Sequence, residues 1–149
     1  MNDLPELYQQ LIVDHNRNPR NFGVLAEANR SAEGDNPLCG DRIKVYLLVE
    51  DGRIVRVGFQ GSGCAISRAS ASLMTQAIHG KTEAQAQALF RTFHAMVTDS
   101  APGRPDPMLG KLVAFAGVRA FPARVKCANL PWHTLRAALA ASRAPVSTE

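Results

Sequence analysis

The strongest constraint on the fold is a pair of alternating sequences that meet at Asp51-Gly52. Apolar and polar side chains alternate over residues 42–50 and again over residues 53–60, and this period of two is typical of strands with one buried face. Asp-Gly favours the tight type I′ turn that joins antiparallel strands. The two sequences therefore predict a β-hairpin. The residues expected on its buried face are Ile43, Val45, Leu47 and Val49 in the first strand and Val55, Val57 and Phe59 in the second.

Helical patterns surround this hairpin. Capping and turn residues predict helices at about residues 4–16, 64–79, 83–97, 107–116 and 131–143, and one short strand within residues 24–37. Gly80 is expected to end the second helix, Thr82 and Gln85 to cap the third, and Pro131 to begin the last, after an irregular segment over residues 121–127. These elements predict an α+β fold, a small antiparallel β-sheet packed against a set of α-helices. The length fits a single domain over residues 1–149.

Three residues with metal-binding side chains lie where the hairpin opens. Cys39 and Asp41 come just before or at the start of the first strand, and Cys64 follows the second strand on the first turn of the next helix. Because a hairpin brings the start of its first strand beside the end of its second, these residues are expected to be near neighbours. Cys127 is expected in a loop before the last helix, and no local pattern fixes its position.

These residue types are compatible with a metal site, although their spacing matches no zinc finger. An odd number of cysteines does not suit a disulfide framework, which leaves a metal site, a reactive thiol and plain core packing as interpretations. Thiols at a helix N-terminus are expected to ionise readily. Thiolates from Cys39, Cys64 and Cys127, with the carboxylate of Asp41, would complete a tetrahedral set for Zn²⁺.

Charge divides the chain into two unequal parts. Residues 1–80 carry 8 basic and 9 acidic groups, whereas residues 81–149 carry 9 basic and 4 acidic ones. The segment from Lys111 to Arg143 holds six basic residues and no acidic one, which suits either a partner with an acidic surface or a solvated face. The chain has no run that predicts a membrane span or a signal peptide, so a cytoplasmic protein is expected. Nucleic-acid binding is disfavoured because there is no aromatic stacking box.

Three motifs, in this order along the chain, resemble those of a known family. They are Asn36-Pro-Leu-Cys39-Gly-Asp41-Arg-Ile43, Gly61-Ser-Gly-Cys64-Ala-Ile-Ser-Arg-Ala-Ser-Ala-Ser-Leu-Met74 and Arg124-Val-Lys-Cys127-Ala-Asn-Leu-Pro-Trp132. They are similar to the iron–sulfur cluster assembly family that includes IscU, the N-terminal domain of NifU and SufU, and the resemblance covers about residues 4–142. The SufU branch is favoured by Lys126, where the scaffold branch has histidine, by Arg124, and by an extra segment over residues 98–120.

The resemblance implies a specific activity. SufU-like proteins bind Zn²⁺ through the positions that correspond here to Cys39, Asp41, Cys64 and Cys127. Cys39 is then the residue that accepts persulfide sulfur from a SufS-type cysteine desulfurase, a pyridoxal-phosphate enzyme, and Arg124 supports this step near the metal or the desulfurase. Such a protein is a sulfurtransferase partner of the desulfurase rather than a stand-alone enzyme, and a downstream iron–sulfur assembly scaffold receives the sulfur.

Three other functions are compatible with the same residues. The first is an IscU-type scaffold that binds iron and carries a transient [2Fe–2S] cluster, for which thiolate ligands are suited. The second is a structural zinc domain without transfer activity. The third, a thiol hydrolase with Cys64 as nucleophile, ranks last because no histidine lies near either of the first two cysteine motifs. The four histidines follow no ligand spacing and are expected at the surface or in packing roles: His15, His79, His94 and His133.

Overall fold

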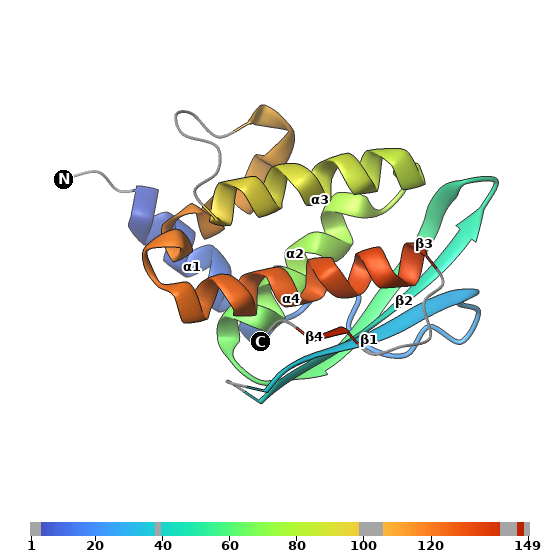
Figure 1. Cartoon of the computed structure of the whole chain (residues 1–149), viewed down its shortest axis with the longest axis horizontal. Coiled ribbons are helices and arrows are strands. Elements are labelled where there is room, and N and C mark those ends of the chain that lie inside the picture. Colours follow the sequence, from blue (N-terminus) through green and yellow to red (C-terminus); the bar gives the residue numbers. More distant parts are fainter. Residues whose placement is uncertain (1–3, 38–39, 99–105, 141–145, 148–149) are drawn as a thin grey trace.

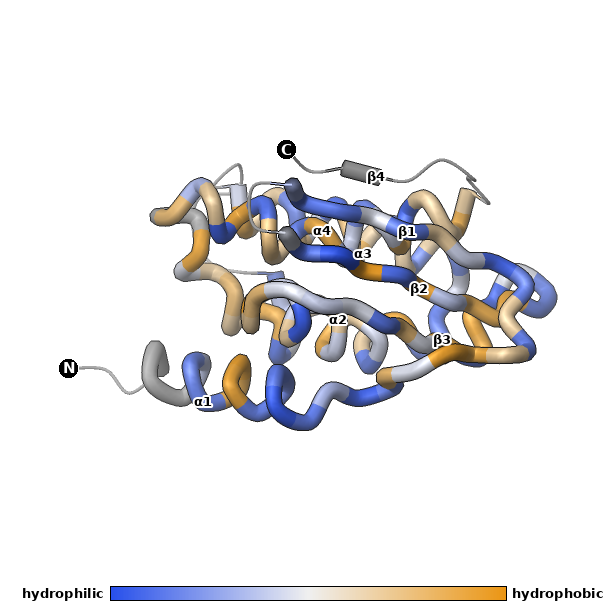
Figure 2. The backbone as a smooth tube through the Cα atoms, turned by 90° about the horizontal axis from the view of Figure 1, so that it is seen from below, coloured by the Kyte–Doolittle hydropathy of each residue, from blue (hydrophilic) through white to orange (hydrophobic). Residues whose placement is uncertain are grey.

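A computed structural model describes residues 4–37, 40–98, 106–140 and 146–147. Its helices are α1 (Leu4–Arg17), α2 (Ala65–Ile78), α3 (Glu83–Val97), the 3₁₀ segment η1 (Pro107–Ala120) and α4 (Pro122–Leu139). Its strands are β1 (Arg30–Asn36), β2 (Asp41–Glu50), β3 (Arg53–Ser62) and β4 (Val146–Ser147). The sheet has the order β3-β2-β1-β4, and its first three strands are antiparallel (Figures 1 and 2). The predicted α+β architecture is therefore confirmed, and a short parallel strand, β4, is added at the edge.

The predicted hairpin is present, with one irregularity. Asp51 and Gly52 both have positive φ, at 53° and 75°, as a type I′ turn requires. A register shift follows Leu48, so that β3 carries one extra residue. This bulge changes the alternation of side chains, and Ile54 rather than Val55 takes the buried position. The expectation for Val55 was wrong for that reason.

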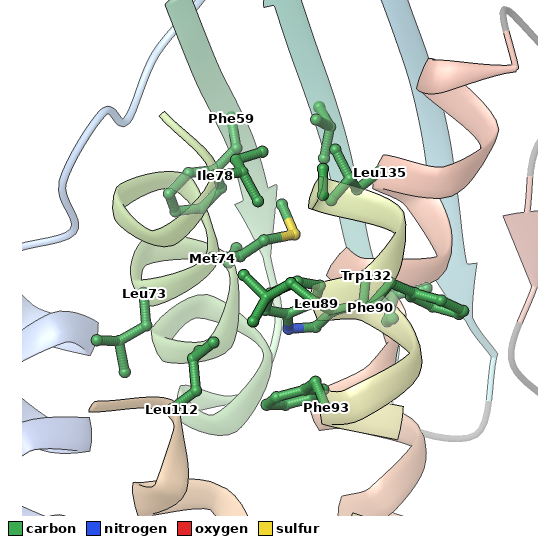
Figure 3. Packing of buried hydrophobic residues seen from close by; sticks show 14 of the residues in the cluster. Phe59, Leu73, Met74, Ile78, Leu89, Phe90, Phe93, Leu112, Trp132 and Leu135 are labelled. Carbon is green, nitrogen blue, oxygen red and sulfur yellow. The ribbon is translucent and has the colours of Figure 1, made fainter. Parts of the chain in front are cut away.

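The helices α2 and α4 pack over one face of the sheet, and α3 packs against α4 and η1 (Figure 1). Contacts join α4 to β1 and β2, and α2 to β3. Phe93 stacks on Trp132 with ring centroids 4.8 Å apart, and these rings lie in a continuous cluster of buried apolar residues between the helices and the sheet (Figure 3). The capping box of Thr82 and Gln85 at the start of α3 is confirmed. None of the helices in the described part of the chain combines the length and apolar character that a membrane span needs.

The last helix differs from the prediction. It begins at Pro122, so Pro131 lies inside it and the segment expected to be irregular is its first turns. Both prolines suit the first turn of a helix, where a missing N–H is tolerated, and tertiary packing decides between them. The hydroxyl groups of Ser70 and Thr134 donate to the carbonyls of Ala128 and Leu130, at 2.7 and 2.8 Å, and support the helix near Pro131. The segment η1 also runs four residues beyond its expected end, with a kink at Gly110.

A buried polar contact fixes α1 on α2. The Nδ1 atom of His15 lies 2.6 Å from the Oγ atom of Ser72, which also accepts a hydrogen bond from the backbone N–H of Arg20 at 2.8 Å. Because the Ser72 oxygen accepts from Arg20, its own hydrogen is available for His15, which suits a neutral imidazole. Burial lowers the pKa of His15, and the charges of Arg20 and Lys111 act in the same direction, whereas Asp14 opposes them.

We expect the stability of the fold to fall in mild acid because of His15. The pKa of His15 in the folded protein is lower than that of an unfolded histidine, about 6.5. The unfolded chain therefore binds the proton first as the pH falls. Stability is lost as the pH falls below about 6.5 toward the lower pKa of the folded state. Thermal melts from about pH 7.5 to about pH 5.5 test this. The variant His15→Gln keeps a hydrogen-bond acceptor and should lose less stability over that range, whereas His79→Gln, at an exposed position, should behave like the unchanged protein. Equal losses in all three proteins would contradict the assignment.

Candidate metal centre

The open end of the hairpin brings Asp41 and Cys64 together. Asp41 is the first residue of β2 and is fully buried, and Cys64 is the N-cap residue of α2 just after β3. The backbone N–H of Cys64 donates to Oδ1 of Asp41 at 2.7 Å, and the Sγ atom of Cys64 lies 3.5 Å from Oδ2. The predicted proximity of these two residues is thereby confirmed.

Gly63 makes this close approach possible. It has a φ of +130°, and a Cβ atom placed on it would lie 2.7 Å from the Cα atom of Asp41 and would overlap the carboxylate itself. An L-residue rarely adopts this φ, and here it would also meet atoms that cannot move away without displacing β2. The absence of a side chain at position 63 is therefore a requirement of the site.

Cys127 joins the pair from α4. It lies one and a half turns into that helix and is 3% exposed. One ligand atom from each of Asp41, Cys64 and Cys127 lies within 4.8 Å of the others. The expectation that Cys127 belongs to a loop was wrong, because the helix begins before it, and the helix itself fixes its position. Among the described residues, no other group of three such side chains comes this close together.

The position of Cys39 lies outside the described residues, so its proximity to Cys64 stays a prediction. Asn36 and Gly40, described residues on the two sides of it, are fixed by contacts. Asn36, the last residue of β1, pairs with Asp41, and the N–H of Gly40 donates to the carbonyl of Asn36 at 2.9 Å. Four residues, 37–40, therefore join β1 to β2, and Cys39 is the third of them.

Burial dominates the protonation of the cysteine on α2. It raises the pKa of the Cys64 thiol, and the charge of Asp41 acts in the same direction. The backbone N–H groups of Ser67 and Ile66 and the side chain of Cys127 oppose this change. The expectation that the helix N-terminus makes this thiol ionise readily is wrong for the chain alone, because burial disfavours the thiolate more strongly.

The residues present fit a zinc ion. Tetrahedral Zn²⁺ with Zn–S near 2.3 Å and Zn–O near 2.0 Å places a sulfur and an oxygen ligand about 3.5 Å apart, which is the separation between Cys64 Sγ and Asp41 Oδ2. Two sulfur donors and one carboxylate are ligand types that Zn²⁺ accepts. They leave one position of the tetrahedron for a fourth ligand.

The other sequence candidates, Arg124 and the four histidines, are not among the three clustered ligands. Arg124 is exposed on the first turn of α4, and its guanidinium lies 4.8 Å from the centre of the Phe121 ring. His15 packs in the interior and His79 is exposed, as expected. One pair that no sequence pattern indicated is His94 and His133, whose rings lie 5.6 Å apart between α3 and α4.

Comparison with known proteins shows the family of this chain. Residues 7–128 match the family model described as NifU-like N terminal domain. The chain is 42% identical over 139 residues to the zinc-dependent sulfurtransferase SufU of Bacillus subtilis, covering 93% of this chain and 92% of that protein. It is 36% identical to the iron–sulfur cluster assembly scaffold protein IscU of Streptococcus pyogenes, covering 93% of this chain and 86% of that protein.

The fold is also found in a solved relative. A crystal structure from Fervidobacterium islandicum, described as an iron–sulfur cluster assembly scaffold protein for the SUF system, superposes with a TM-score of 0.82. Its sequence is 36% identical, and the match covers 90% of this chain and 97% of that one. Family model, relatives and fold agree with the three sequence motifs. This chain therefore belongs to the iron–sulfur cluster assembly family of the NifU-like N-terminal domain, and SufU and IscU proteins are its relatives.

Proposed function

We propose that the protein is a zinc-dependent sulfur acceptor that acts in the cytoplasm. It takes persulfide sulfur from a SufS-type cysteine desulfurase and supplies it to a downstream scaffold for iron–sulfur cluster assembly. The observation that carries the proposal is that ligand atoms of Asp41, Cys64 and Cys127 lie within 4.8 Å of one another, in a chain similar to a zinc-dependent sulfurtransferase.

Each residue has a distinct role in this proposal. Asp41, Cys64 and Cys127 would hold Zn²⁺, and Cys39 would supply the fourth ligand. When bound, the ion favours the thiolate form of its cysteine ligands at neutral pH. Asp41 also orients Cys64 through the hydrogen bond from the Cys64 backbone N–H. Cys64 and Cys127 are held by helices, whereas Cys39 belongs to the four-residue connection between β1 and β2.

The transfer itself is a thiol–persulfide exchange. The thiolate of Cys39 attacks the terminal sulfur of the persulfide on the desulfurase, and a new S–S bond forms on this chain. The old S–S bond breaks, and the cysteine of the desulfurase leaves as a thiolate. The transferred terminal sulfur keeps its proton, and because one S–S bond replaces another, no external oxidant or reductant is needed.

Metal analysis distinguishes this relay from the scaffold function, which the IscU relatives also support. We expect protein purified without oxygen to contain about one zinc per chain and to show no visible absorption. Iron with sulfide and a brown colour would favour the scaffold instead. Unchanged protein that is purified fully folded and without zinc would count against the relay. A zinc protein that takes no sulfur from the desulfurase, as measured by mass spectrometry, would be a structural zinc domain.

The surface beside the centre is suited to docking the desulfurase. Phe121 is 52% exposed, Arg124 lies over its ring, and both stand at the start of the helix that carries Cys127. Lys126 adds a second positive charge within the basic segment from Lys111 to Arg143. An exposed aromatic ring with an arginine is a frequent anchor in protein interfaces, so we propose an acidic partner surface here.

Charge reversal tests this surface. We expect Arg124→Glu combined with Lys126→Glu to weaken desulfurase binding by about tenfold at low ionic strength, with a smaller effect as salt is added. The matched control is Arg91→Glu, an exposed position on α3, which should bind like the unchanged protein. Affinities measured at several salt concentrations decide the question, and an unchanged affinity of the double variant at low salt would remove Arg124 and Lys126 from the interface.

A further inference from the structure

Asn36 connects the two parts of the chain that bear the ligands. It ends β1, is fully buried, and pairs in the sheet with Asp41. Its backbone carbonyl accepts the N–H of Gly40 at 2.9 Å and so closes the connection that contains Cys39. Its side-chain Nδ2 donates to the Sγ atom of Cys127 at 3.8 Å, across 91 positions of sequence. One residue therefore contacts both the hairpin and α4 at the centre.

We infer that Asn36 is a positioning residue that keeps the Cys127 sulfur bound and weakly nucleophilic. This inference rests on the proposed function and addresses which thiol takes the sulfur. A hydrogen bond to a ligand sulfur withdraws electron density from it and fixes its orientation, as other outer ligand contacts do at metal sites. Cys127 is also almost completely buried on a helix. The amide of Asn36 thus disfavours Cys127 as the thiol that takes the incoming sulfur.

A purely structural role of Asn36 predicts different results for its replacement. A buried amide must find hydrogen-bond partners, and a residue that only filled space could be replaced by leucine, which has a similar size. The difference between the two roles lies in the sulfur of Cys127, since only the positioning role changes its electronic state. The measurement must therefore report on that sulfur.

Cobalt-loaded protein supplies such a measurement. The absorption band for charge transfer from sulfur to Co²⁺ should move to lower energy in Asn36→Leu, because the sulfur regains electron density. Zinc should bind about tenfold more weakly in a chelator competition, because the Cys127 sulfur loses the contact that fixes its orientation. Cys127 should also react faster with iodoacetamide. The control is Asn29→Leu, because Asn29 donates to the carbonyl of Val49 away from the site, and its band should not move. An unchanged band and unchanged zinc affinity in Asn36→Leu would overturn the inference.

A second measurement uses the unchanged chain, in case Asn36→Leu does not fold. In protein loaded with ¹¹³Cd, the side-chain amide protons of Asn36 should show scalar coupling to the metal through the Cys127 sulfur. Bound cadmium without that coupling would overturn the inference. The spectra require no desulfurase, so the two proposals fail separately: a protein with the cobalt and cadmium signatures that accepts no sulfur refutes the proposed function alone.

Discussion

Gly63→Ala is expected to remove the metal from the protein while the helices and the sheet remain folded. The added methyl group would overlap the Asp41 carboxylate and would lie 2.7 Å from the Asp41 Cα atom. Either β2 moves or Asp41 turns away, and in both cases the carboxylate leaves the position from which it faces Cys64. Zinc content should fall from about one per chain to near zero after dialysis against a chelator, with lower thermal stability than the zinc-loaded protein.

Gly23→Ala is the matched control for that experiment. Gly23 has nearly the same φ, +133°, but no heavy atom lies within 4 Å of the position of an added Cβ. It therefore carries the backbone strain of the substitution without the overlap. Loss of zinc in Gly63→Ala alone assigns the effect to Asp41. Retention of zinc by Gly63→Ala, or equal loss in both variants, would show that the close approach at position 63 does not hold the site.

The sequence predicts the hairpin and the half of the site that depends on it. Alternation and an Asp-Gly turn are local signals, and they determine the register that places Asp41 beside Cys64. The bulge at Val55 was not predictable in this way. The bulge has no signal of its own in the sequence. It changes only which side chains of the strand face the core.

The first residue of the last helix could not be predicted from local sequence signals. Pro122 and Pro131 both suit the first turn of a helix, and no local sequence signal favours one of them as its start. The structure selects Pro122 because the residues from Cys127 to Leu139 bury an almost continuous apolar surface. Hydroxyl groups near Pro131, one of them on α2, support a helix that the proline alone would weaken.

Two contributions to the site came from contacts between distant segments. Cys127 reaches the centre only through the packing of α4 against the sheet and α2, so no spacing in the sequence could place it. In the sequence, Asn36 stands out only as the first residue of the motif that contains Cys39 and Asp41. A signal was available in its position at the end of a strand, where a buried amide needs a partner, but the identity of that partner, Cys127, depends on the fold.

The second large effect is expected from Cys39→Ser. This variant should reduce stimulation of the desulfurase to the level measured without added protein, because the proposed acceptor thiol is gone. Zinc should be retained in part, since Asp41, Cys64 and Cys127 remain as three ligands. Turnover with cysteine as substrate measures the stimulation, and mass spectrometry of proteolytic peptides finds the additional sulfur.

Cys127→Ser separates the loss of an acceptor from the loss of the metal. Cys127 is buried on α4 and contacts Asn36, so its replacement should weaken zinc binding and lower the melting temperature, because the binding free energy of a structural zinc, about 10–16 kcal/mol in zinc-finger peptides, is coupled to folding. Cys39→Ser should lose stimulation with a smaller change in melting temperature, because Cys39 lies in the connection between β1 and β2 and not on a packed helix. Additional sulfur on the peptide that contains Cys127, together with full stimulation by Cys39→Ser, would reassign the acceptor and would favour the scaffold function over the relay.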